Sequence, residues 1–535
     1  MQLIKKSNIK DILKKTSVHL PVLIILFIAL STGIFGINFG PHWDEGAIIK
    51  TVTMSIEYGT ILPDQYVYPS MLYNLINLSI LPDVLHNYEN SDRTKMLKEF
   101  FPYTWGRSYL SNSYITRSNL ADISKSEHFK IRTRILFMFI AYFSVLFVYI
   151  LVLTWRKSWI EALLASSLIG LSWEVAYQSK WVGPDAILMQ FGALTMMCIF
   201  LAINNKKNEF WLMMAAIAAG LGFGSKYPGA ILLIPVLTAG FYNFNGNSFK
   251  AQIYLFCKIL LFFILAYLVS TPGTIFQFKD FIKDTSTDFL DYGIRGNESF
   301  TIAPGLTHLF KMLMYFCMAV FSKYSAISCV FFFLTVMGAF SLIMKEKKIA
   351  VILLCFPVLY VLSFSRLIVM KVRNLMVLIP FFAILASIGY TFLCDKIKYP
   401  FFRRSFSVLI SVLLLINAGW LVYSSYSIRM EDKTNYIEQL SHYLDQRPDI
   451  LFLLSEHVAN DLLAYDKKNR SNVTLNYSHN VKAACLYAFD IPIAELKANQ
   501  YNYTWEWFGP YDVNYNYYPS WIGHNRIVVM PVNKN

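Results

Sequence analysis

The chain has 535 residues, of which 56% are hydrophobic and only 15% charged, and its formal net charge is +14. Soluble globular proteins are typically about 45–50% apolar and about 25% charged, so this composition excludes an ordinary soluble protein. The basic residues gather in short segments between apolar runs, which favours membrane topology over nucleic-acid binding as the origin of the positive charge. The seven cysteines lie mostly in or beside apolar runs, so no disulfide framework is indicated.

Repeated apolar runs of about 17–25 residues predict a polytopic α-helical membrane protein. Five lysines precede the first run, so the positive-inside rule places the N-terminus in the cytoplasm. No cleavable signal peptide is evident. Alternating sides give about eleven spans, with the C-terminus outside and nearly all dense basic clusters inside. The expected spans are about 19–37, 131–154, 159–173, 186–202, a pair flanking "GFGSKYPG", 251–270, three ending at "KEKK", "SRLIVMKVRN" and "DKIKYPFFRR", and 405–423.

Two long outer loops are expected, at about 38–130 and 271–308. Within the first, residues 62–84 are apolar but are interrupted by Asp64, Pro69 and Pro82. Counting them as a span would invert every later side and place the basic clusters outside. They are therefore expected to form a helix on the outer surface, as is the stretch "PGLTHLFKMLMYFCMAVF".

The chain divides into a transmembrane catalytic domain, residues 1–423, and an extracytoplasmic soluble domain, residues 424–535. The second part alternates β-type runs, "ILFLL" and "RIVVMPV", with polar helical stretches such as "TNYIEQLSHYLDQ". This pattern predicts a small α/β domain with one modest core. Its aromatic tail, "NQYNYTWEWFGPYDVNYNYYPSWIG", either stacks on sugars or packs the domain on the membrane interface, where Tyr and Trp are enriched.

Polar residues gather at the predicted outer ends of the spans. "FGPHWDEGAIIK" carries two adjacent carboxylates just after the first span. With the other outward groups they form one set at a common depth. The set is Asp44, Glu45, Arg132, Arg134, Asp185, Lys226, Lys371 and Arg373.

A few acids and several bases at one depth suit the transfer of a sugar from a polyprenyl phosphate. That reaction needs a base to accept the proton of the acceptor, and cations to hold the departing phosphate as negative charge grows on it. The lipid tail of the donor stays in the bilayer, so the chemistry belongs at helix ends. A divalent cation between Asp44 and Asp185 would suit carboxylate ligands, although the sequence does not require a cofactor.

Each group also has a structural interpretation. Asp44 and Asp185 stand where helix N-caps are expected, and Glu45 would favour the helix dipole. Arg134 and Lys226 are placed to snorkel toward lipid headgroups. No His or Cys cluster has a metal-ligand spacing, and "GFGSKYPG" is a turn rather than a phosphate loop.

The order of short motifs resembles the GT-C family of glycosyltransferases that use dolichyl- or polyprenyl-phosphate sugars. These include the protein O-mannosyltransferases and the bacterial transferase that adds aminoarabinose to lipid A. The motifs are "DEG", a surface helix after "YP", "TRILFMF", "GPDAILMQFGALTMM", "GLGFGSKYPGAILLIP" and "VMKVRNLMVLIPFFAILA". The resemblance covers residues 1 to about 423, and the C-terminal domain is not covered closely.

The resemblance implies a role for each outward group. Asp44 matches the proposed catalytic base, with Glu45 as its acidic neighbour, and Asp185 matches the acid that opens the fourth span. Arg134, rather than Arg132, matches the arginine that opens the second span. Lys226 and Arg373, with Lys371 nearby, match basic positions near the lipid phosphate. The family often has His-Pro-Pro before the surface helix, where this chain has Tyr68-Pro69-Ser70, so no role for that histidine carries over.

The resulting hypothesis is a single displacement with inversion, in which Asp44 deprotonates or orients the acceptor hydroxyl. Arg134, Lys226 and Arg373 stabilise the leaving polyprenyl phosphate, and Glu45 and Asp185 shape the site. The implied partners are a polyprenyl-phosphate-linked sugar donor, a lipid, glycan or protein acceptor, and membrane lipids, with no nucleic acid. The expected location is a bacterial inner membrane with a periplasmic C-terminus. A glycan polymerase or ligase would need similar groups, whereas a transporter predicts charges near the bilayer midplane, which are not seen in this pattern.

Overall fold

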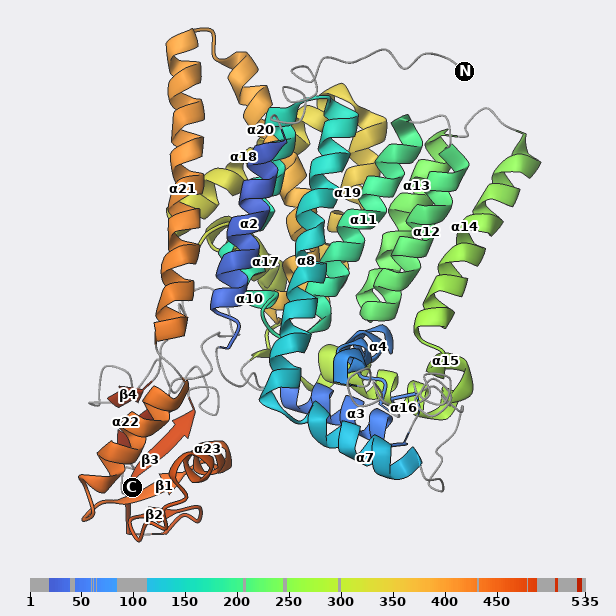
Figure 1. Ribbon diagram of the computed structural model, residues 1–535. Coiled ribbons are helices and arrows are strands. Elements are labelled where there is room, and N and C mark those ends of the chain that lie inside the picture. Colours follow the sequence, from blue (N-terminus) through green and yellow to red (C-terminus); the bar gives the residue numbers. More distant parts are fainter. Residues whose placement is uncertain are drawn as a thin grey trace, which may run out of the picture.

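The protein is described by a computed structural model, in which most residues form a bundle of long helices and a small α/β unit follows the last of them (Figure 1). The described residues are 19–38, 44–58, 60, 62–63, 65–83, 113–204, 208–243, 248–296, 300–430, 433–478, 480–487, 506–508 and 527–531. His42, Trp43, Asp64 and nearly all of the aromatic tail lie outside them.

The bundle consists of twelve long or medium helices together with three short ones that lie between them. The longer helices are α2 (Leu20–Phe35), α8 (Glu127–Arg156), α9 (Trp159–Gly170), α11 (Pro184–Asn204), α12 (Asn208–Ser225), α13 (Leu233–Asn243), α14 (Phe249–Ser270), α17 (Leu306–Met318), α18 (Ser325–Lys345), α19 (Lys347–Phe364), α20 (Ile379–Lys396) and α21 (Pro400–Met430). The short ones are α10 (Trp173–Gln178) and two 3₁₀ helices, η1 (Tyr227–Leu232) and η4 (Val372–Leu378).

Seven helical stretches among the described residues are long and apolar enough to cross a membrane. They are 127–156, 184–204, 249–270, 325–345, 347–364, 372–396 and 400–426. Four shorter apolar helices, at 20–35, 159–170, 227–242 and 306–318, accompany them. These helices confirm the predicted class of a polytopic α-helical membrane protein, whereas the number of about eleven spans stays a prediction.

The predicted outer loops contain helices that gather at one end of the bundle (Figure 1). The first loop holds α3 (Glu45–Tyr58), α4 (Met71–Leu78) and α7 (Ser113–Ser124), and the second holds α15 (Gly273–Phe276), α16 (Phe278–Leu290) and the single π turn η2 (Asp291–Arg295). The surface helix expected over residues 62–84 is much shorter, because the chain becomes helical only after Pro69. Its Leu72 and Ile76 are fully buried.

The local sequence sets the helix starts nearest the site. α8 begins at Glu127 because the Ser126 hydroxyl accepts a hydrogen bond from the Phe129 amide at 3.2 Å. α11 begins with Pro184, which needs no hydrogen-bond acceptor in the first turn, and the carboxylate of Asp185 follows in that turn.

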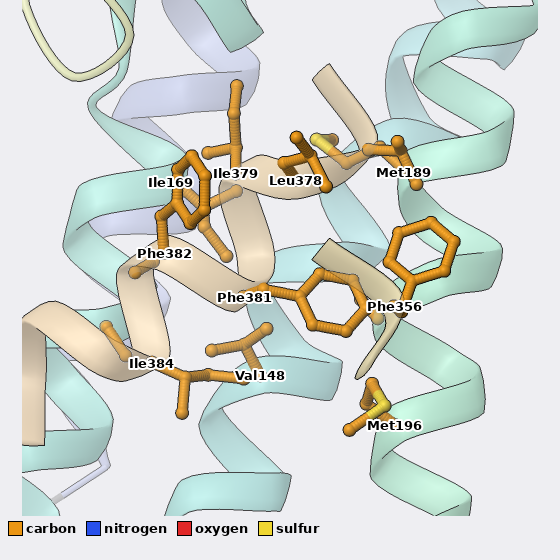
Figure 2. Packing of buried hydrophobic residues seen from close by; sticks show 14 of the residues in the cluster. Val148, Ile169, Met189, Met196, Phe356, Leu378, Ile379, Phe381, Phe382 and Ile384 are labelled. Atoms are coloured by element: carbon orange, nitrogen blue, oxygen red, sulfur yellow. The ribbon is translucent and has the colours of Figure 1, made fainter. Parts of the chain in front are cut away.

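The main core surrounds the start of α20, where residues from five helices interdigitate (Figure 2). The Phe381 ring lies against the Phe356 ring of α19, with their centroids 4.9 Å apart. Val148 of α8, Ile169 of α9 and Met189 of α11 pack around them (Figure 2). This core fixes the end of η4, which carries the predicted site residue Arg373 in its first turn and follows directly after Lys371.

Two glycines mark a close contact between α18 and α20. A Cβ atom at Gly389 would lie 1.9 Å from the carbonyl oxygen of Leu334, and one at Gly338 would lie 1.8 Å from that of Leu385. Small residues at such crossings let two backbones approach closely, which is how membrane helices gain packing energy without a hydrophobic driving force.

The C-terminal unit is a small α/β domain, as expected. Its sheet has the order β2-β1-β3-β5-β4, with β1 parallel to β2 and β3, and β5 antiparallel to β3 and β4. The strands are β1 (Leu451–Leu454), β2 (Val473–Thr474), β3 (Val481–Tyr487), β4 (Glu506–Phe508) and β5 (Ile527–Pro531), and the helices are α22 (Lys433–Asp445) and α23 (Glu456–Asp466). α21 continues past the predicted domain boundary at residue 423 and ends at Met430.

We predict that Gly389→Ala lowers the thermal stability of the purified protein, because its methyl group meets a backbone oxygen that cannot move without separating α18 from α20. Gly419→Ala on α21 is the matched control, since nothing lies within 4 Å of a Cβ atom there. Thermal unfolding in detergent measures both variants. Equal stability of the two variants would contradict this account of the α18–α20 contact.

Candidate active site

Five of the predicted site residues come from four separate elements that end at the same place. Asp44 directly precedes α3, and Asp185 lies in the first turn of α11. Lys226 joins α12 to η1, and Lys371 and Arg373 lie at the start of η4. The end of the bundle is the one that carries α3, α4 and α16 (Figure 1).

Arg373 is the centre of this cluster. Its Nη1 forms an ion pair with the carboxylate of Asp44, and its Nε lies 3.7 Å from Oδ2 of Asp185. Lys226 Nζ donates to the other oxygen of Asp185 at 2.5 Å and to Oδ1 of Asn374 at 2.6 Å. The cluster therefore links α3, α11, the α12–η1 junction and η4 through charged groups.

The two carboxylates differ in access. The side chain of Asp44 is 19% exposed, whereas that of Asp185 is 3% exposed and has both oxygens beside basic groups. Arg373 and Lys226 are 7% and 10% exposed. Asp44 is therefore the carboxylate that a substrate can reach more easily.

Glu45 and Arg134 form a second, fully buried ion pair beside the cluster. Arg134 Nε and Nη2 donate to the two carboxylate oxygens of Glu45 at 2.9 and 2.5 Å, and Nη1 donates to the carbonyl oxygen of Ile37 at 2.9 Å. The amide of Val182 also donates to Glu45, at 2.8 Å. The pair thus ties α3 to α8, to the end of α2 and to the segment before α11.

This arrangement changes the roles expected for the pair. The guanidinium of Arg134 is fully enclosed and bound to Glu45 and Ile37, so the structure does not bring it to the surface where a donor phosphate would lie. Glu45 accepts hydrogen bonds from Arg134. No hydrogen bond between Glu45 and Arg373 occurs among the described residues. The neighbouring Arg132 instead pairs with Asp83 and is partly exposed.

The five residues "WVGPD" before and into α11 position the cluster. The Trp181 ring lies under Arg373, with the guanidinium carbon 5.1 Å from the ring centroid, and its Nε1 donates to Gln178 at 3.0 Å. A Cβ atom at Gly183 would lie 2.3 Å from this ring, so glycine leaves the space that Trp181 fills. The buried indole supports Arg373 by a cation–π contact.

Several neighbours of the cluster were not predicted. Tyr68, in the "YP" motif, lies near Asp44 and Arg373, and burial together with the charge of Asp44 raises its pKa. Burial also raises the pKa of Tyr292 to about 12. Tyr360 donates to the carbonyl oxygen of Asn374 at 2.5 Å. The position of Tyr68 before the surface helix was the available signal, whereas nothing in the sequence marked Tyr292 or Tyr360.

A further carboxylate reaches the cluster from α16. Asp288 lies near Lys226 and Lys371. Burial raises the pKa of Asp288, and the positive charges of the two lysines act in the opposite direction. Burial, followed by repulsion from Arg373, lowers the pKa of Lys371 to about 8. Lys371 also lies over the Phe300 ring, 5.1 Å from its centroid.

The second outer loop holds the basic segment in place by backbone hydrogen bonds. The amide of Ile368 donates to the carbonyl oxygen of Tyr292 at 2.9 Å, and that of Met370 donates to the carbonyl oxygen of Phe300 at 3.0 Å. Thr301 and Val369 form an antiparallel bridge between them. The residues leading into Lys371 and Arg373 are thereby bound to the loop that carries Asp288.

The two carboxylates considered for a divalent cation are paired with basic groups in this structure. Asp44 and Asp185 face Arg373, and Asp185 also binds Lys226. Among the described residues, no three His, Cys, Asp or Glu side chains meet as a metal site. A divalent cation between Asp44 and Asp185 therefore stays a prediction from the sequence.

Residues 94–282 match the model of the family described as dolichyl-phosphate-mannose-protein mannosyltransferase. The match includes Arg134, Asp185 and Lys226 but not Asp44, Lys371 or Arg373.

Two solved structures are similar over most of the chain. ArnT from Cupriavidus metallidurans bound to undecaprenyl phosphate is 10% identical, with 95% of this chain and 97% of that chain covered and a TM-score of 0.46. The archaeal oligosaccharyltransferase AglB from Archaeoglobus fulgidus, in complex with an inhibitory peptide and a dolichol-phosphate, is 11% identical, with 91% and 71% covered and a TM-score of 0.49. None of the curated proteins compared with the chain matches it.

We predict that Glu45→Gln and Arg134→Met each destabilise the protein strongly, because each leaves a buried charge without its partner, which typically costs about 3–5 kcal/mol. The double variant Glu45→Gln with Arg134→Met is expected to recover part of that loss, because neither charge then remains. Thermal unfolding in detergent provides the double-mutant cycle.

Arg132→Met is the control for this cycle, because its pair with Asp83 is partly exposed and such pairs contribute about 0–1 kcal/mol. If Arg132→Met lowered stability as much as Arg134→Met, the structural role of the buried pair would be refuted.

Proposed function

We propose that the protein transfers a single sugar from a polyprenyl-phosphate donor to an acceptor hydroxyl at the outer face of the membrane. The observation that carries this proposal is the pairing of the partly exposed Asp44 with Arg373, beside Lys226 and Lys371, at the ends of membrane helices. The match of residues 94–282 to the model of the dolichyl-phosphate-mannose-protein mannosyltransferase family supports the same class of reaction.

Asp44 acts as the base. Its side chain is more exposed than that of Asp185, and it is ion-paired with Arg373. Asp185 is held by Lys226 and Arg373 and keeps both bases in position. The proton of the acceptor hydroxyl passes to Asp44 as the oxygen attacks the anomeric carbon, which inverts its configuration in a single displacement.

Arg373, Lys371 and Lys226 bind the phosphate of the donor. A polyprenyl phosphate that leaves gains negative charge as the bond to the sugar breaks, so fixed cations beside it lower the barrier. Arg373 is suited to bridge Asp44 and the donor phosphate, because its planar guanidinium presents several N–H groups at once. It binds Asp44 in the free protein and can offer its remaining donors to phosphate oxygens.

The site lies where a lipid-linked donor would present its sugar. The charged groups occur at helix ends rather than at mid-bundle, so the polyprenyl chain remains among the apolar helices while the phosphate meets water. We place this end outside the cytoplasm, in a bacterium at the periplasmic face of the inner membrane, because the opposite end carries the basic loops. The acceptor is a lipid, glycan or protein hydroxyl.

We predict that Asp44→Asn reduces transfer by at least about 100-fold, since a positioned general base contributes about 10²–10⁴-fold to rate. Cells that lack the protein are rescued with wild type or with the variant at equal expression, and their surface glycoconjugates are compared by mass spectrometry. Asp122→Asn is the matched control, because that carboxylate is exposed and pairs only with the nearby Lys125.

The same spectra distinguish the reaction classes. Loss of one sugar mass, restored by wild type and by Asp122→Asn, is the expected result. Loss of long polymers with single units intact would show a polymerase or ligase instead. Full rescue by Asp44→Asn would refute the catalytic role of Asp44.

We also predict that the apparent KM for the donor rises above about pH 8 while it stays nearly constant below. Lys371 has a lowered pKa of about 8, so its ammonium is present at lower pH and is lost as the pH rises through that value. Lys371→Arg keeps its charge throughout this range and is expected to remove the alkaline rise. An unchanged alkaline rise in that variant would exclude Lys371 as its cause.

A further inference from the structure

Two thiol groups meet between α17 and α18. Cys317 lies in the last turn of α17 and Cys329 in the second turn of α18, and their Sγ atoms are 3.3 Å apart. Both side chains are partly exposed, whereas Cys198, Cys394 and Cys485 are buried. A disulfide bond is about 2.05 Å long, so a small rotation of the two side chains is enough to join them.

The surrounding contacts keep the two thiols together. The Phe316 and Phe332 rings lie face to face across the same two helices, 6.4 Å apart. In the connection between the helices, the amide of Phe321 donates to Ser328 at 3.3 Å and its carbonyl accepts from Asn417 of α21 at 3.0 Å. The close approach of the sulfur atoms therefore belongs to a packed region of the bundle.

Cys329 lies in the half of α18 that is remote from the basic segment at Lys345, and Cys317 of α17 lies beside it. α18 ends at Lys345, and the next residue, Glu346, pairs with Arg156 at 3.1 Å among the segments expected in the cytoplasm. Cys329, near the start of α18, is therefore on the side of the catalytic cluster. This step rests on the orientation given under the proposed function. The extracytoplasmic side of a membrane is the compartment in which disulfides form and persist.

We propose that Cys317 and Cys329 are joined by a disulfide bond in the mature protein. The oxidant is an oxidised protein disulfide on the outer face. One thiolate attacks it to form a mixed disulfide, and the second thiolate then attacks the first sulfur of this chain. Two S–H bonds and one disulfide of the oxidant are lost, and one Sγ–Sγ bond and two thiols on the oxidant are gained.

The bond would support the segment that carries the site. His308, in the first turn of α17, is hydrogen-bonded through Nδ1 to the carbonyl oxygen of Leu367 at 2.7 Å, and the amide of Gly305 donates to Ser365 at 2.6 Å. These contacts lie a few residues before Lys371. Fixing α17 to α18 therefore fixes a support of the chain that leads to Lys371 and Arg373.

The test is alkylation of the protein under denaturing conditions, before and after reduction, followed by peptide mass spectrometry. Cells are lysed in denaturant with excess maleimide, so that burial and thiol exchange do not affect labelling. The expected result is a peptide pair cross-linked through Cys317 and Cys329, with both residues labelled only after reduction, whereas Cys257 and Cys355 are labelled at once. Labelling of Cys317 and Cys329 before reduction, to the same extent as Cys257, would overturn the proposal.

Two variants complete the test. Cys317→Ser should make Cys329 available to maleimide without reduction, and Cys355→Ser should leave the cross-linked pair unchanged. Reductant should lower the unfolding temperature of wild type but not that of the Cys317→Ser, Cys329→Ser double variant. Asp44→Asn should retain the disulfide, so failure of the disulfide proposal and failure of the catalytic role of Asp44 are distinguished by separate readouts.

Discussion

Arg373 is the residue on which the geometry of the cluster depends. Its guanidinium pairs with Asp44, approaches Asp185 and rests on the Trp181 ring, and thereby joins three elements distant in sequence. A nearly buried guanidinium is tolerable only if its charge is compensated on several sides. The contacts that satisfy Arg373 also fix the candidate base and the carboxylate that holds Lys226, so the electrostatic requirement of one side chain orders the whole site.

Different residues around the site provide structural support and take part in the proposed reaction. Glu45 is next to Asp44 in sequence, yet it binds Arg134 and the amide of Val182, and so anchors the start of α3 while Asp44 turns toward Arg373. The segment "WVGPD" also supports the site, because the Trp181 ring fills the space that Gly183 leaves open and Asp185 follows directly in the chain. The two adjacent carboxylates of "HWDEG" therefore perform different tasks, one structural and one proposed to be catalytic.

The sequence predicted the helical membrane class, the small α/β domain and the gathering of Asp44, Asp185, Lys226, Lys371 and Arg373, because apolar length and charge at helix ends follow from local composition. The sequence did not predict the buried ion pair between Arg134 and Glu45, because it places both residues at the outer ends of helices without showing which partner each one meets. Asp288 and Tyr292 were missed because the second outer loop appeared featureless. Its return along residues 368–370 depends on backbone pairing, which side-chain patterns do not reveal.

The proposed mechanism requires Arg373 to bridge Asp44 and the donor phosphate. An experimental structure of the protein with a polyprenyl phosphate bound would test this bridge. Phosphate oxygens are expected within hydrogen-bond distance of Arg373 and Lys371, with the Asp44 carboxylate open toward the acceptor side. A phosphate bound elsewhere, with Arg373 still held only by Asp44 and Asp185, would contradict the proposed mechanism.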